Sequence, residues 1–108
     1  MSQVIQVTDQ NFQDEVENYK GPMMVEFYAT WCPHCQRMEP VIKKLADEYA
    51  GKVRFVAVDI DKSPKSSDKY QIQGTPTMFF FSKEGGEPNS IAGEQSVQTL
   101  KEFLDEII

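Results

Sequence analysis

The alternation of strand and helix patterns along the chain limits its possible folds more than any other feature. Short apolar runs typical of buried strands alternate with stretches in which apolar residues recur at helical spacing. The pattern predicts strands over residues 4–7, 23–28, 53–58 and 77–81 and a last one ending at residue 92, with helices over about 9–19, 33–50, 64–70 and 97–107. Alternation that ends in a hairpin predicts an α/β fold, with a mixed sheet covered by helices on both faces.

Several of the predicted helices begin next to residues that cap helices. A side-chain oxygen at the capping position accepts a hydrogen bond from a free backbone N–H group of the first turn. We expect Thr8 or Asp9 to cap the first helix, and Ser63, followed by Pro64, to cap the short helix over 64–70. We expect Ser96 to cap the last helix.

Composition bounds the class of protein. The chain fits a single domain, residues 1–108. Its formal net charge of −6 argues against nucleic acid and anionic membrane surfaces as partners, and no apolar run approaches the length of a membrane span. The first residues lack the basic and apolar regions of a signal peptide. If Met1 is the native start, we therefore expect a cytoplasmic protein, and we expect a monomer.

The chain has two cysteines, Cys32 and Cys35, with Pro33 and His34 between them and Trp31 before them. A disulfide that closes so small a loop would contribute only about 2 kcal/mol, against about 3 kcal/mol for a loop of roughly 15 residues. A structural cross-link would gain more from distant cysteines. The spacing therefore predicts a pair that cycles between dithiol and disulfide.

A metal site and a pair of unreactive buried thiols are the alternative interpretations. Zinc usually takes four ligands, and this chain offers one cysteine pair and a single histidine, His34. Only a dimer that shares ligands would complete such a site. Pro33 and His34 are not typical core residues, which argues against unreactive thiols. We expect no bound metal and no cofactor.

Several motifs together carry a family resemblance. They are residues 25–35, Pro40, the Gly74-Thr75-Pro76-Thr77 segment, Gly93 and residues 100–104. A strand that leads through Trp-Cys-x-x-Cys into a helix, with a downstream Gly-Thr-Pro-Thr, resembles the thioredoxin family over nearly the whole chain. The resemblance implies the thioredoxin fold: a central mixed five-stranded sheet in the order 1-3-2-4-5, with the last strand antiparallel, flanked by four helices. It also implies a cis peptide bond between Thr75 and Pro76.

The resemblance implies a distinct role for each cysteine, and helix physics supports it. Cys32 would lie at the amino end of the long helix, where free N–H groups and the helix dipole favour an anion. Such placement lowers a thiol pKa from about 8.5 into a range of roughly 3.5–7.5. We expect Cys32 to attack a substrate disulfide as a thiolate, and Cys35 to resolve the mixed disulfide.

The dipeptide between the cysteines departs from the usual thioredoxin pattern. Pro33-His34 replaces Gly-Pro and is the dipeptide found in the periplasmic oxidase DsbA. A partly protonated His34 would stabilise the Cys32 thiolate and make the disulfide more oxidising than that of ordinary thioredoxin. In the alternative interpretation, His34 only faces solvent on the first helical turn.

The buried acid of the family corresponds to Glu26, and the lysine that often accompanies it corresponds to Ala57. Burial in an apolar strand without that cation should raise the pKa of Glu26. From beneath the cysteines, Glu26 would take the proton of Cys35 as a general base, directly or through a water. Alternatively, its carboxyl group reaches the surface.

The resemblance further implies a substrate groove beside the cysteines. Its expected residues are Trp31, Pro33, Gly74, Thr75, Pro76 and Gly93. The Thr75 backbone, turned outward by a cis Pro76, would pair with an extended substrate segment. Structural interpretations stay open, with Trp31 as core and Gly74 and Gly93 as simple turns.

These features together predict a thiol–disulfide oxidoreductase that reduces protein disulfides and receives electrons from a thioredoxin-reductase-type partner. A disulfide oxidase or isomerase of the same fold is one alternative. DsbA-type oxidases carry a large helical insertion, for which 108 residues leave no room. A non-catalytic peptide-binding module that uses the same groove is the other alternative.

Overall fold

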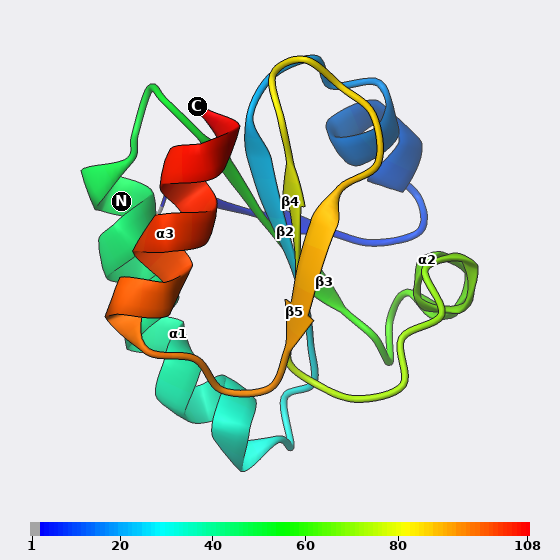
Figure 1. Cartoon of the computed structure of the whole chain (residues 1–108). Helices are drawn as coiled ribbons and strands as arrows, with labels where there is room; N and C mark the ends of the chain where they lie inside the picture. The colour runs from blue at the N-terminus through cyan, green and yellow to red at the C-terminus, as the bar shows by residue number, and fades with distance from the viewer. Residues whose placement is uncertain (1–2) are drawn as a thin grey trace.

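The computed structural model describes residues 3–108, so the expectation about the start at Met1 lies outside the described residues (Figure 1). Five strands form one sheet in the order β1-β3-β2-β4-β5. Their bounds are β1 Val4–Val7, β2 Met23–Tyr28, β3 Arg54–Asp59, β4 Thr77–Phe81 and β5 Asn89–Ala92. The predicted α/β fold and its strand order are confirmed.

The sheet is mixed, as predicted. The neighbours β1 and β3, and β3 and β2, pair in parallel, whereas β2 with β4 and β4 with β5 pair antiparallel. The last strand is thus antiparallel to its one neighbour, and β4 is the strand that runs against the other four.

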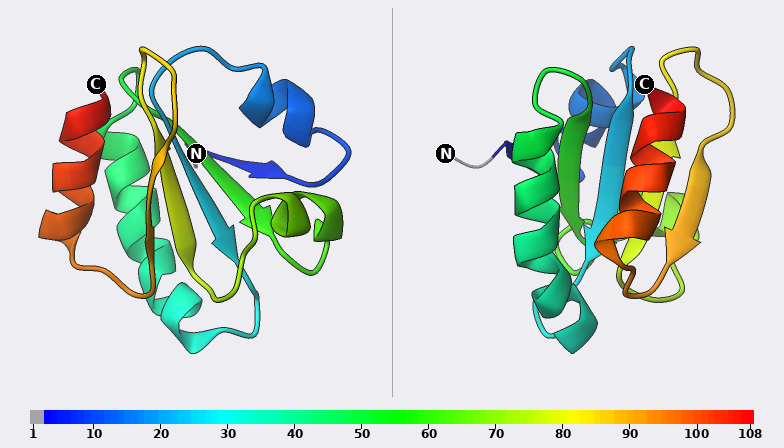
Figure 2. Two further views of the ribbon diagram at one scale, coloured as in Figure 1. Left: turned by 45° about the vertical axis from the view of Figure 1, so that its right-hand side comes forward. Right: turned by 60° about the vertical axis from the view of Figure 1, so that its left-hand side comes forward.

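Helices cover both faces of this sheet (Figure 2). They are η1 Gln13–Glu17, α1 Pro33–Glu48, α2 Pro64–Lys69 and α3 Val97–Ile107. The helices α1 and α3 pack on one face through Met38, Leu45 and Leu100. On the other face, where η1 and α2 lie, Phe12 and Val16 pack against the sheet. Each face therefore has its own apolar core.

The central strand β2 serves both cores because side chains alternate across a strand. Met24 belongs to the core on the α1 face, and Val25 and Phe27 belong to the core on the η1 face. Glu26, in phase with Met24, points toward α1. A carboxyl group is thus placed in an otherwise apolar layer.

The first helix differs from the prediction over 9–19. It is a short π-helix, in which the Asn18 N–H donates to the Gln13 carbonyl at 2.8 Å. Neither Thr8 nor Asp9 caps it, and no side chain does. The predicted capping role was therefore wrong for this helix.

Asp9 instead caps α2, although more than 50 residues separate it from that helix in the sequence. Its carboxylate accepts hydrogen bonds from the backbone N–H groups of Lys65 at 3.0 Å and Ser66 at 2.9 Å, and from the Ser66 hydroxyl at 2.7 Å. Ser63 precedes the helix as predicted, but its side chain accepts no hydrogen bond from the first turn, whose N–H groups donate to Asp9 instead. Ser96 does cap α3, since its hydroxyl oxygen accepts from the Thr99 N–H at 3.1 Å.

Strand pairing brings distant segments to one edge of the sheet. The end of β2 pairs with the start of β4 through Phe27 and Thr77, and Thr77 pairs in turn with Ala92 at the end of β5. Tyr28, the last residue of β2, pairs with Asp59 at the end of β3. The loops that follow β2, β3 and β5 and the loop that precedes β4 therefore meet at this edge.

Within residues 3–108, no helix combines the length and apolar character that crossing a membrane requires. The same part of the chain holds no group of three or more His, Cys, Asp or Glu side chains suited to bind a metal ion.

Candidate active site

The cysteine pair lies where the loop after β2 becomes α1. Cys32 is the N-cap of α1, with an extended backbone, and Pro33 begins the helix. The Cys32 sulfur accepts a hydrogen bond from the Cys35 N–H at 3.3 Å. Both thiols are free and almost buried, at 4% and 5% exposure. A side-chain atom that accepts from a free N–H at a helix start is well placed to carry negative charge.

The two thiols have opposite acid–base character. Burial disfavours the Cys32 thiolate, but hydrogen bonds with Cys35 and Thr75, together with the backbone N–H groups of Cys35 and His34, outweigh it and hold the pKa of Cys32 below its ordinary value. Burial, and then the hydrogen bond with Cys32, raise the pKa of Cys35 to about 11. Cys32 is therefore suited to attack, whereas Cys35 needs a base before it can react.

Glu26 is the buried acid beneath the pair. Only 6% of the residue is exposed, so its carboxyl group does not extend into solvent. Burial, followed by the charges of Glu39 and Cys32, raises the pKa of Glu26 to about 7. Ala57 lies directly across from Glu26 in the register of β2 and β3, so β3 supplies no cation at this position.

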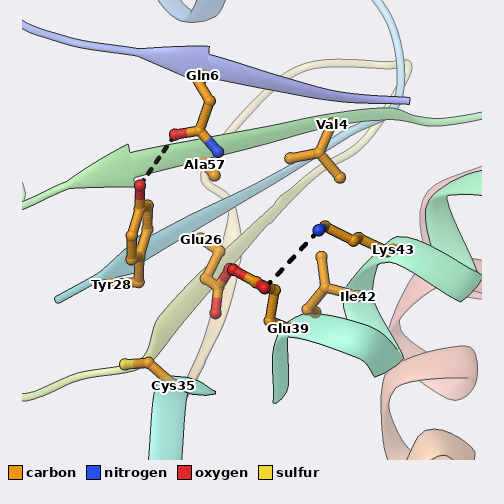
Figure 3. Close-up of a pocket in the computed structure, with 9 residues that line it drawn as sticks. All are labelled: Val4, Gln6, Glu26, Tyr28, Cys35, Glu39, Ile42, Lys43 and Ala57. Atoms are coloured by element: carbon orange, nitrogen blue, oxygen red, sulfur yellow. Dashed lines mark hydrogen bonds and ion pairs between the residues drawn. The ribbon is translucent and has the colours of Figure 1, made fainter. Parts of the chain in front are cut away.

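A small cavity of about 60 Å³ lies between Glu26 and the start of α1 (Figure 3). Cys35 lines one side of it, and Glu39 and Lys43 line the other, joined by an ion pair of 3.7 Å. A polar cavity needs roughly 10–15 Å³ to hold a water molecule. The space is therefore large enough to hold a water molecule between Cys35 and Glu26.

His34 belongs to a cluster of charged side chains at the rim of the site. Its Nδ1 lies 2.9 Å from the Glu94 carboxylate and 2.9 Å from the Arg37 guanidinium. Arg37 also donates from Nε to both Glu94 oxygens, at 3.0 and 3.2 Å. The imidazole is 58% exposed, but it is held by these partners rather than surrounded by solvent alone.

A groove of about 380 Å³ runs beside Cys32, lined among others by Trp31, Cys32, Pro33, Gly74 and Thr75. Trp31 is 65% exposed and is therefore not a core residue. Its indole N–H donates to Asp61 at 2.9 Å, which holds the ring at the edge of the groove.

The segment opposite Cys32 has the predicted backbone. The Thr75–Pro76 peptide bond is cis, and the Thr75 carbonyl accepts a hydrogen bond from the Cys32 thiol at 3.5 Å. Gly93 adopts a φ of +90°, which favours glycine, and its N–H donates to the Pro76 carbonyl at 2.7 Å. At Gly74 φ lies outside that region and a Cβ would meet open space, so its backbone does not require glycine.

The structure adds site residues that the sequence did not predict. Arg37 and Glu39 lie one helical turn after His34 and Cys35, so helical spacing was a signal for both. Asp61 and Glu94 come from loops after β3 and β5 and reach the site only through the folded sheet. No local pattern identifies those two.

Comparison with known proteins agrees with this geometry. The profile of the Thioredoxin family matches residues 3–106. Thioredoxins of Staphylococcus aureus, among them those of strains Mu50 and COL, are 36% identical to the chain over 102 residues, which cover 94% of this chain and 95% of theirs. With its pair of cysteines at the start of α1 and its cis proline, the chain belongs to the thioredoxin family of thiol–disulfide oxidoreductases.

Proposed function

We propose that the protein reduces disulfides of other proteins, with Cys32 as nucleophile, Cys35 as resolving thiol and Glu26 as general base. One observation carries the proposal, namely the arrangement of two thiols and a buried acid. The Cys32 sulfur accepts a hydrogen bond at the start of α1, which favours its anion, and Cys35 lines the same cavity as the buried carboxyl group of Glu26. Because the pKa of Glu26 is about 7, Glu26 exchanges protons readily near neutral pH.

The reaction proceeds in two exchanges. The Cys32 thiolate attacks one sulfur of the substrate disulfide, a bond forms between them, and the other substrate sulfur leaves as a thiolate. Glu26 then takes the proton of Cys35, whose sulfur attacks Cys32 and displaces the second substrate thiolate. The substrate gains two electrons and, from solvent, two protons, while Cys32 and Cys35 become a disulfide. A thioredoxin-reductase-type partner returns the two electrons.

The groove supports an extended protein segment as substrate. The exposed face of Trp31 offers an apolar contact, and the cis Thr75–Pro76 segment places a backbone carbonyl beside Cys32. Extended segments are recognised through such backbone groups. We also propose that the protein is a monomer and acts in the cytoplasm, where cysteine pairs of this kind are mostly catalytic.

We also propose that this protein is more oxidising than ordinary thioredoxin. His34 and Arg37 place two potential cations near Cys32, and stabilising the thiolate stabilises the reduced form. Equilibration with defined ratios of reduced and oxidised glutathione would measure the potential. We expect a value above the roughly −270 mV of thioredoxin, and a value near the roughly −120 mV of DsbA would favour the oxidase instead.

Insulin reduction tests the activity itself. We expect Cys32→Ser to abolish turnover, and Cys35→Ser to accumulate a mixed disulfide through Cys32. If the unmodified protein binds the extended chain but never reduces it, and Cys32→Ser binds it equally well, the protein is a binding module and the proposal fails.

A further inference from the structure

Glu94 is an acidic residue at the rim of the active site that has no role in the exchange steps proposed above. It lies in the loop between β5 and α3, 60 residues from His34. Its carboxylate contacts the His34 Nδ1 at 2.9 Å and the Arg37 Nη2 at 2.9 Å, in addition to the Arg37 Nε. One carboxylate therefore binds both basic side chains of the first two turns of α1.

Hydrogen bonds of the residues on either side of Glu94 hold its loop in place. The Gly93 N–H donates to the Pro76 carbonyl at 2.7 Å, next to the cis peptide that faces Cys32. The Gln95 side chain donates to the Ala92 carbonyl at 3.0 Å. The carboxylate is thus fixed over the amino end of α1.

Arg37 connects this cluster to the reactive thiol. The pKa of Arg37 is raised by its hydrogen bonds with Glu94 and also by the charge of Cys32, and the pKa of Glu94 is lowered by its bonds to Arg37 and His34. Cys35 on the same helix and Glu26 on β2 also interact with Cys32.

We infer that Glu94 is a positioning residue that limits the reactivity of Cys32, because it holds His34 and Arg37 in one cluster and offsets the positive charge of Arg37 at the Cys32 sulfur. The inference rests on the thiol–disulfide chemistry of the family. It concerns a difference between variants, so it does not depend on the absolute potential proposed above.

The direction of the effect follows from the charges. Arg37 is cationic throughout the accessible pH range. Replacing Glu94 by a neutral residue removes the negative charge that is paired with Arg37. The positive charge of Arg37 then acts on the Cys32 sulfur without that offset, so the thiolate is stabilised.

Glu94→Gln tests this, with Glu106→Gln as a matched control. Glu106 is an exposed acid at the end of α3, which lies at the opposite end of the molecule from the start of α1 (Figure 1). We expect Glu94→Gln to titrate Cys32 at lower pH and to shift the glutathione equilibrium about two- to fivefold toward the reduced protein, as for an exposed ion pair. The control should shift neither.

Arg37→Gln extends the test in the opposite direction. It removes the cation, so it should raise the pH at which Cys32 titrates, and the double variant with Glu94→Gln should titrate close to the unmodified protein. If Glu94→Gln matches the Glu106→Gln control, or raises the titration midpoint of Cys32, the inference is overturned. The absolute potential of the unmodified protein tests the proposed function separately.

Discussion

The two faces of the sheet are built alike but serve different ends. On the η1 face, Phe12, Phe27, Tyr70 and Phe79 form a cluster of rings with centroids 5.2–6.2 Å apart. On the α1 face, an equally apolar core is interrupted near the cysteines by Glu26 and its cavity. Packed aromatic rings fill the first face, whereas the second contains a buried carboxyl group, Glu26, whose burial costs free energy.

This difference predicts which substitutions change stability and which change chemistry. A change in the aromatic cluster should lower stability and leave the cysteines unaltered in the folded molecule. A change at Glu26 should slow the reaction and increase stability. The following predictions test that separation, from the largest expected effect to the smallest.

Phe27→Ala should have the largest effect, because Phe27 is fully buried and contacts three other rings. We expect a loss of about 3–5 kcal/mol in the free energy of unfolding, measured by denaturant titration. The titration of Cys32 in the folded variant should match that of the unmodified protein. A loss under about 1 kcal/mol would show that the two faces do not differ in this way.

Glu26→Gln should stabilise the fold at neutral and higher pH. The pKa of Glu26 is about 7 in the folded protein, against an ordinary value of 4.5, so the folded chain keeps a proton that the unfolded chain releases between these values. Stability therefore falls as pH rises from about 4.5 to about 7, by about 3 kcal/mol in total. Unfolding curves from pH 4.5 to 8 should show this fall in the unmodified protein and its absence in Glu26→Gln. An identical pH dependence in the two would contradict it.

The same variant should slow the resolving step. Without a base for Cys35, whose pKa is about 11, we expect the rate of mixed-disulfide resolution at pH 7 to fall about 100-fold. Stopped-flow fluorescence of Trp31, the one tryptophan of the chain, would follow it. Glu39→Gln, at the exposed mouth of the same cavity, is the control and should have a smaller effect. Equal rates for Glu26→Gln and the unmodified protein would remove the general-base role.

His34→Gln should have the smallest effect, because the imidazole is exposed and lies against the Glu94 carboxylate. We expect Cys32 to titrate at a somewhat higher pH and the glutathione equilibrium to shift about two- to fivefold toward the disulfide. The shift should shrink in high salt, which screens exposed charges. An unchanged Cys32 titration would exclude His34 from the control of the thiolate.

Much of the fold and site followed from the sequence because the signals are local. Helical and strand periodicity predicted the order of elements, and the Ser96 cap depends on residues three positions apart. The burial of Glu26 followed from its apolar neighbours in β2, and the position of Ala57 opposite Glu26 was expected from the family pattern. Cys32, Pro33 and Cys35 are close in space because they are close in sequence.

Contacts between distant segments were decided by the tertiary structure alone. Asp9 caps a helix 57 residues away, and it displaces Ser63 from a role that local pattern favoured. Trp31 binds Asp61, and His34 binds Glu94, only because strand pairing brings the loops after β2, β3 and β5 to one edge of the sheet. A hydrogen bond depends on distance and direction between two atoms, and for residues so far apart these exist only after the sheet has formed. The sequence by itself therefore determined the cysteine pair with Glu26 and His34 beside it, and the tertiary structure decided that Asp61 and Glu94 join them.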